Sequence, residues 1–126
     1  MSQGDWPDAL EEAAYYGLAG EIARAIEPHT EADPVAVLIQ FLMAFGNVIG
    51  HSAHYQVEAD PHYTNLFAVL VGDSAKSRKG TSWGHVRRIF GDIDPVWQRR
   101  RLKTGGLSTG EGLIWTVRDQ DGNDEK

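Results

Sequence analysis

The chain has 126 residues, of which 41% are hydrophobic and 24% charged, and its formal net charge is −6. This composition excludes a disordered protein, and the length allows one compact domain with a buried core. The absence of cysteine excludes a disulfide framework and a thiolate metal site. Because the first residues, MSQGDWPDALEE, are acidic and lack the apolar region of a secretion signal, we expect a cytoplasmic protein.

Positive charge is concentrated in the second half of the chain. Ten acidic residues lie between Asp5 and Asp60, whereas nine Lys or Arg residues lie between Lys76 and Lys103. A surface that binds a polyanion such as DNA would therefore belong to residues 76–103. The candidate DNA contacts are Arg87, Arg88, Arg99, Arg100 and Arg101. The alternative is a solvated helix face that pairs with the acidic first half.

The first 50 residues (1–50) are predicted to form a helical segment. Apolar residues recur at near-helical spacing from residue 8 to residue 27, and Pro28 then ends the pattern. These apolar residues are Leu10, Ala14, Leu18, Ile22 and Ile26. We therefore expect a first helix over 8–27 that lies on the surface with one face buried.

A second helix is predicted to begin at Asp33 and Pro34, since Asp is a preferred N-cap and proline is favoured at the first helical position. It should reach Ile49 or Gly50. Its residues are apolar nearly all round, which indicates burial on several sides. Its apolar run has only about 15 residues, whereas a membrane-spanning helix needs roughly 20, so we expect no membrane partner.

Beyond residue 50 the pattern changes from helix to strand. The segment HYQVEAD, which begins at His54, alternates enough to predict a strand, and the Asp60–Pro61 pair should end it. Residues 65–72 (NLFAVLVG) form a short continuous apolar run that stops at glycine. Such a run is typical of a central strand that is buried on both faces of a parallel sheet.

Three further helices are predicted after this run. The first covers residues 80–90, the second begins at Asp94–Pro95, and the third covers residues 108–118. One face of the first is expected to hold Trp83, Val86, Ile89 and Phe90, while Arg87 and Arg88 point away. Residues 120–126 have no apolar anchor, so we expect a disordered tail.

The segment between the apolar run and the next helix has the order of a phosphate-binding loop. In FAVLVGDSAKSRKGTSW, a predicted strand, a loop from Gly72 to Gly80 and a helix start follow each other directly. In such loops backbone N–H groups hold the anion, a lysine reaches the terminal phosphates and a hydroxyl binds Mg²⁺. Lys79 is the candidate phosphate lysine and Thr81 the candidate Mg²⁺ ligand, with Ser82 as its neighbouring substitute.

The spacing of this segment departs from the usual pattern of glycine, four residues, Gly-Lys and then Ser or Thr. Counting from Gly72 puts Ser77 at the second glycine and Arg78 at the lysine. One additional residue brings Lys79 into place, and the hydroxyl then follows one residue late. The candidate nucleotide-binding residues are Gly72, Ser77, Arg78, Lys79, Gly80, Thr81 and Ser82. The alternative is an ordinary polar turn whose basic side chains are solvated.

Most of the sequence from Tyr16 to Asp119 consists of three stretches: GLAGEIARAIEPHTEADPVAVLIQFLMAFGNVIG, HYTNLFAVLVGDSAKSRKGTSW and GGLSTGEGLIWTVRD. In this order they resemble the N-terminal portion of a family of uncharacterised domains found in bacterial, plasmid and phage primase/helicase-like proteins, often beside a primase-polymerase module. The resemblance implies an α/β fold, namely that of a RecA-like P-loop ATPase. Residues 51–119 would form the first part of this ATPase domain. The resemblance further implies ATP and Mg²⁺ as ligands, DNA as a partner, and Gly72, Lys79 and Thr81 as nucleotide-site residues.

Hydrolysis of ATP by a P-loop enzyme also needs an acid on a second strand, which holds Mg²⁺, and a group that orients water. No apolar strand that ends in Asp or Glu follows the loop. We therefore expect a truncated ATPase that binds nucleotide but does not turn over ATP alone, and that acts with DNA as a homo-oligomer in a longer protein. The alternative functions are a non-catalytic nucleic-acid-binding module that uses residues 76–103, and a remnant that self-associates through an exposed sheet edge.

Two weaker signals remain in the sequence. Ser108 and Glu111 have the spacing of a capping box, although under the resemblance Glu111 could instead act near nucleotide or DNA. His51, His54 and His62 are weak metal candidates, because side chains three residues apart on a strand point to opposite faces.

Overall fold

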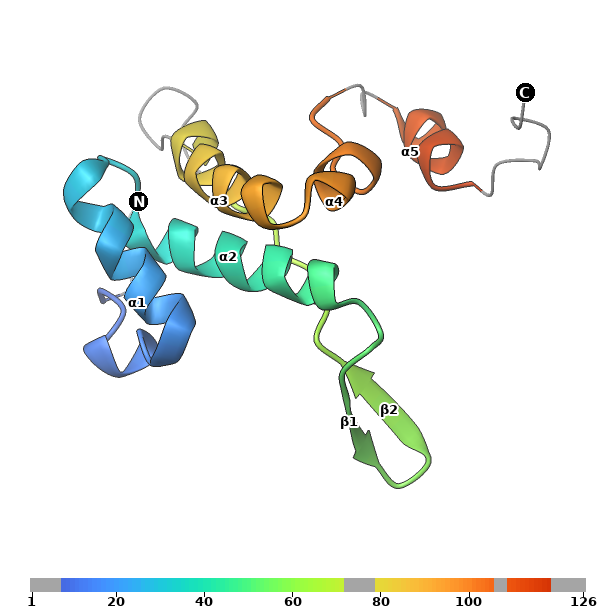
Figure 1. Cartoon of the computed structure of the whole chain (residues 1–126), viewed down its shortest axis with the longest axis horizontal. Coiled ribbons are helices and arrows are strands. Elements are labelled where there is room, and N and C mark those ends of the chain that lie inside the picture. The colour runs from blue at the N-terminus through green and yellow to red at the C-terminus, as the bar shows by residue number, and fades with distance from the viewer. Residues whose placement is uncertain (1–7, 72–78, 106–108, 119–126) are drawn as a thin grey trace, which may run out of the picture.

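The computed structural model describes residues 8–71, 79–105 and 109–118. Within these ranges it contains helices and one small antiparallel sheet (Figure 1). In chain order the elements are the 3₁₀ helix η1 (Glu12–Ala14), α1 (Gly17–Ile26), the 3₁₀ helix η2 (Glu27–His29), α2 (Pro34–Ile49), β1 (His54–Val57), β2 (Asp60–Tyr63), α3 (Lys79–Ile93), α4 (Pro95–Arg100) and α5 (Gly110–Val117). Figure 1 shows α2 at the centre, with α1 near its beginning and the hairpin beyond its end.

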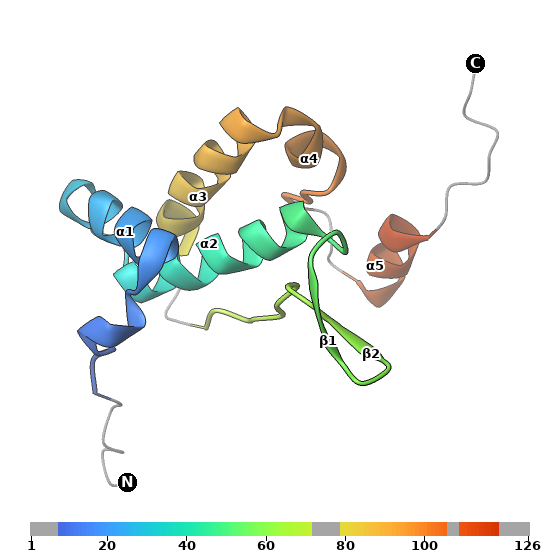
Figure 2. The same cartoon turned by 60° about the horizontal axis from the view of Figure 1, so that its bottom comes forward.

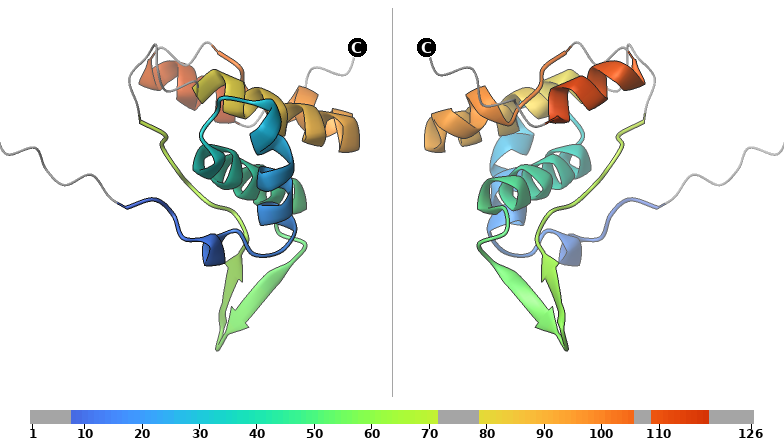
Figure 3. Two further views of the ribbon diagram at one scale, coloured as in Figure 1. Left: turned by 90° about the vertical axis from the view of Figure 1, so that its left-hand side faces the viewer. Right: turned by 90° about the vertical axis from the view of Figure 1, so that its right-hand side faces the viewer.

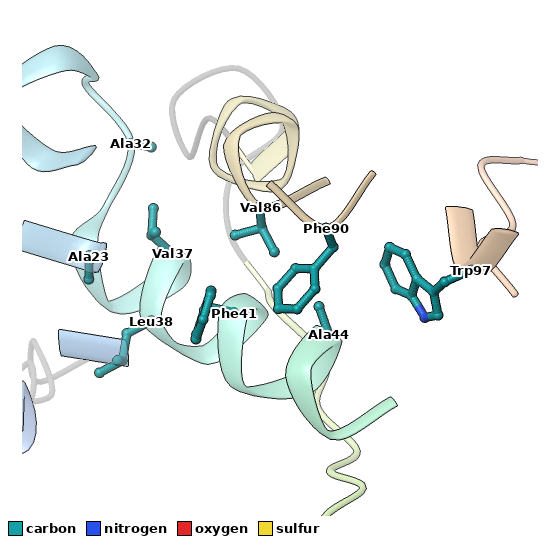
Figure 4. Close-up of a cluster of buried hydrophobic side chains, with 9 residues drawn as sticks. All are labelled: Ala23, Ala32, Val37, Leu38, Phe41, Ala44, Val86, Phe90 and Trp97. Atoms are coloured by element: carbon teal, nitrogen blue, oxygen red, sulfur yellow. The ribbon is translucent and has the colours of Figure 1, made fainter. Parts of the chain in front are cut away.

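Helix α2 organises the core because α1 and α3 both pack against it. It begins as predicted: the Asp33 carboxylate accepts a hydrogen bond of 2.8 Å from the Val35 N–H, and Pro34 lies in the first turn. Its burial on several sides is also confirmed. The core, drawn in Figure 4, consists of Ala23, Ala32, Val37, Leu38, Phe41, Ala44, Val86, Phe90 and Trp97.

Three aromatic rings connect α2, α3 and α4 within this core. The ring centroids of Phe41 and Phe90 lie 5.2 Å apart, and those of Phe90 and Trp97 lie 5.8 Å apart. Both pairs are tilted, a geometry that adds to the stability gained from burial. These ring contacts therefore link α4 to α2 through Phe90 of α3.

The single helix predicted over 8–27 is wrong. The chain instead forms η1 and α1, separated at Tyr15 and Tyr16, and Gly17 takes a positive φ of 69°. A Cβ at Gly20 would overlap the backbone carbonyl of Tyr15, so the chain before α1 folds back onto the helix. As a result Leu10 and Leu18 are exposed, and the buried residues of α1 are Gly20 and Ala23.

The structure confirms that a strand begins at His54. This strand ends at Val57, and the predicted end at Asp60–Pro61 is instead the beginning of β2. Strands β1 and β2 pair antiparallel with His54 opposite Tyr63, and the turn lies at residues 58–59, where Glu58 has a φ of 51°. Pro61 is tolerated inside β2 because a two-stranded sheet consists of edge strands only. All strand residues are exposed, and the hairpin projects from the helices.

The buried central strand predicted over 65–72 is wrong for the residues that the structure describes. Residues 65–71 have no strand partner, and Phe67, Val69 and Val71 are 92%, 87% and 90% exposed. Figures 2 and 3 show this segment passing along α2 towards the start of α3. A central strand is buried by a strand on each side and by a layer of helices on each face. Among the described residues, segment 65–71 has no neighbouring strand and has helices along one side only (Figures 2 and 3), so it stays exposed. The expected mainly parallel sheet is likewise not found in the described ranges.

The helices after residue 78 follow the predictions closely. Helix α3 buries Val86 and Phe90 and exposes Arg87 and Arg88, as expected. Helix α4 begins after Asp94, whose carboxylate accepts hydrogen bonds from two backbone N–H groups of its first turn. The last helix differs in its cap, because the Thr109 hydroxyl accepts the bond from the Gly112 N–H at 3.1 Å. Ser108 and the predicted tail over 120–126 lie outside the described residues.

Gly46 is the point at which the chain after β2 crosses α2. A Cβ at this position would overlap the carbonyl group of Thr64, so only glycine permits the close approach. We expect Gly46→Ala to destabilise the fold by about 1–3 kcal/mol in urea unfolding followed by circular dichroism. Gly84 of α3 is the matched control, because open space surrounds its Cβ position.

Gly84→Ala should stabilise the fold by about 1 kcal/mol through helix propensity alone. A stabilising effect of Gly46→Ala of the same size would show that the backbone at Thr64 does not lie on α2.

Candidate functional site

The candidate phosphate-binding segment is described only from Lys79 onwards. Gly72, Ser77 and Arg78 lie outside the described residues, whereas Lys79 and Gly80 are the first residues of α3. Thr81 is exposed, and Ser82, its predicted substitute, is only 1% exposed. Of the two hydroxyl groups, Thr81 is therefore the one that a ligand can reach.

The beginning of α3 is electrostatically suited to an anion. The first backbone N–H groups of a helix have no partner within the helix, and the helix dipole places partial positive charge there. The first turn of α3 contains no acidic residue that would oppose an anion. A phosphate at this helix end would therefore meet both N–H donors and positive potential.

A depression of about 630 Å³ lies beside Thr81, between the start of α3 and the segment that follows α1. Its lining consists of Pro28, His29, Thr30, Glu31, Thr81 and His85. Sequence reasoning did not select His29, Glu31 or His85, because no local pattern connects residues 29–31 with residue 81. Among the described residues, no group of His, Asp and Glu is arranged to hold a metal ion.

A second and larger cavity, of about 910 Å³, lies between α2, α4 and the segment over 65–70. Its polar lining includes the amides Gln40, Asn47 and Asn65, and its aromatic lining includes Phe67, Trp83 and Trp97. Arg101 and Lys103 provide positive charge. The sequence gives no local signal of this cavity, because its lining comes from four separate parts of the chain.

Two hydrogen bonds to Asn47 hold α4 and its end against α2. The Trp97 indole N–H donates to the Asn47 side-chain oxygen at 2.7 Å, and the Arg101 guanidinium donates to the Asn47 backbone carbonyl at 3.2 Å. Gln40, about two helical turns before Asn47, is 8% exposed. Its side-chain oxygen is buried and has no hydrogen-bond partner in the part of the chain that the structure describes.

The predicted DNA contacts are all exposed, as a binding surface requires. They are Arg87 and Arg88 on α3, Arg99 and Arg100 on α4, and Arg101 directly after α4. Arg101 differs from the other four because it also bonds the backbone of α2 and lines the larger cavity.

The histidines of the hairpin region make ring contacts with a tyrosine. His51 stacks on Tyr63 with ring centroids 3.9 Å apart and 18° between the ring planes, and His54 lies 5.8 Å from the same ring. These contacts, stacked for His51 and tilted for His54, give the two histidines a structural role. Glu111, the alternative nucleotide or DNA residue, lies exposed in the first turn of α5.

A membrane-spanning helix is not found among the residues that the structure describes. No family model, curated protein or solved structure matches the chain.

Proposed function

We propose that this chain binds ATP with Mg²⁺ through residues 72–82, as the nucleotide-binding part of a cytoplasmic, primase/helicase-like P-loop ATPase that acts in DNA replication of a mobile element or phage. The observation that carries the proposal is the start of α3 at Lys79. The candidate lysine thus stands at a helix N-terminus that follows a glycine-containing segment, which is the order of a phosphate-binding loop.

In this proposal each residue of the first turn has its own task. The Lys79 ammonium group binds the terminal phosphates, and the exposed Thr81 hydroxyl ligates Mg²⁺. The backbone N–H groups of residues 79–82 contribute partial positive charge to the phosphate site.

We further propose a RecA-like α/β fold for the whole ATPase, in which the phosphate-binding loop leads into the helix that begins at Lys79.

ATP with Mg²⁺ is expected to raise the melting temperature of the chain, and Lys79→Ala is expected to abolish the increase. At about 100 times its dissociation constant a ligand stabilises the folded state by roughly 2.7 kcal/mol. The measurement is a thermal unfolding series with ATP or a non-hydrolysable analogue, with Mg²⁺ or with a chelator. Arg88→Ala removes an exposed cation from the same helix and should leave the increase intact.

Equal increases in the native chain and in Lys79→Ala would contradict the role of Lys79. The absence of any increase at millimolar ATP would contradict nucleotide binding by this chain.

A further inference from the structure

We propose that the cavity between α2, α4 and residues 65–70 binds a nucleotide, that is, a planar base that carries a phosphate. This inference goes beyond the proposed ATP site, because none of the residues that carry it belongs to segment 72–82. It rests on three properties of the cavity lining: an unpaired polar atom, aromatic side chains and positive charge.

Gln40 supplies the unpaired polar atom. Its side-chain oxygen is buried without a hydrogen-bond partner among the described residues, and the residue lines the cavity. A buried acceptor without a partner is unfavourable, so the site is most stable when a ligand supplies an N–H or O–H donor. A primary amide offers an acceptor and a donor side by side, and this pair matches the edge of adenine.

Aromatic side chains provide surfaces on which a planar base can stack. Trp83 of α3, which is half-buried, and the exposed Phe67 both line the cavity, whereas Trp97 of α4 also lines it but is only 5% exposed and offers little ring surface. Bases stack on such rings with little dependence on sequence. The cavity volume of about 910 Å³ lies within the range of small-molecule sites and is sufficient for a base with its sugar.

Positive charge at the cavity fits the phosphate. Arg101 and Lys103 line it, and none of the described residues in the lining is acidic. This local balance contrasts with the net charge of −6 of the chain. An anion is therefore favoured at this cavity, while the acidic first half of the chain would repel it elsewhere.

The test uses the fluorescence of the two cavity tryptophans. Trp6→Phe and Trp115→Phe leave Trp83 and Trp97 as the only tryptophans in the chain. This protein is titrated, in the presence of EDTA, with a single-stranded oligo-deoxyadenylate of about 12 nucleotides and separately with deoxyadenosine monophosphate, because stacking quenches tryptophan emission. We expect saturable quenching by the oligonucleotide; additional quenching by the monophosphate would show that a free nucleotide also suffices.

Two substitutions connect the quenching with the cavity. Lys103→Glu should weaken binding by about tenfold or more, whereas Arg118→Glu, the same change of charge at an exposed residue directly after α5, should leave it within about twofold. Gln40→Leu should also weaken binding, and it should not destabilise the fold, because it removes an acceptor that has no partner.

Several outcomes overturn the proposal: no quenching by either probe, or equal binding by the native protein and Lys103→Glu. Lys79→Ala separates this site from the proposed ATP site, since it should abolish the ATP-dependent thermal shift and leave the quenching unchanged. Loss of quenching in Lys79→Ala would assign the signal to the phosphate loop and would also overturn the proposal.

Discussion

Replacing Phe90 with Ala is expected to lower the free energy of unfolding by about 3–5 kcal/mol. Phe90 is 3% exposed, and its ring lies between the rings of Phe41 and Trp97. The substitution leaves a cavity where α2, α3 and α4 meet, and it also removes two aromatic contacts. Since small domains are stable by only about 5–15 kcal/mol, chemical denaturation should show a large shift of the unfolding midpoint.

Phe67→Ala is the control for this prediction. It also tests whether Phe67 is exposed, as in the structure, or buried in a central strand, as the sequence pattern predicted. Phe67 is 92% exposed, so its loss should change the free energy of unfolding by less than about 0.5 kcal/mol. A central strand buried on both faces would instead give Phe67 a cost as large as that of Phe90. Similar costs for the two substitutions would therefore contradict the exposure of residues 65–71 in this chain.

The helices could be predicted from sequence where local chemistry determines them. Asp33 and Asp94 each precede proline, and both carboxylates accept the backbone hydrogen bonds expected of N-caps. The apolar face of α3 was likewise correct at Val86 and Phe90. Caps and helical faces depend on residues within one or two turns, so a single sequence contains the necessary information.

The errors arose where close backbone packing or absent partners determine the structure. Gly20 fits closely against the backbone of Tyr15, a contact that no hydrophobic spacing reveals, and it divides the first predicted helix. The apolar run over 65–71 has the composition of a buried strand, but burial requires neighbouring strands, which the described residues do not supply. Periodicity predicts the faces of an element and not what covers them.

One of the two candidate sites could be predicted from the sequence and the other could not. The order of residues predicted a helix start near Lys79, and α3 begins there. The larger cavity could not be predicted, because Gln40, Trp97 and Lys103 come together only through packing of α4 against α2. The helix that carries Gln40 is apolar at most positions. Only the structure shows that the Gln40 side-chain oxygen is buried without a hydrogen-bond partner among the described residues.

Trp97→Ala is expected to destabilise the chain by about 3–5 kcal/mol, and Trp115→Ala by less than about 0.5 kcal/mol. Trp97 is 5% exposed and donates its indole N–H to Asn47, whereas Trp115 on α5 is 64% exposed. Trp97→Phe separates the two contributions, because it keeps an aromatic ring and removes the N–H donor. Its cost should lie between those of the two alanine variants, with about 0.5–1.5 kcal/mol for the lost hydrogen bond. Urea unfolding followed by circular dichroism measures all three variants. Equal costs for Trp97→Ala and Trp115→Ala would show that α4 does not pack against α2 and α3.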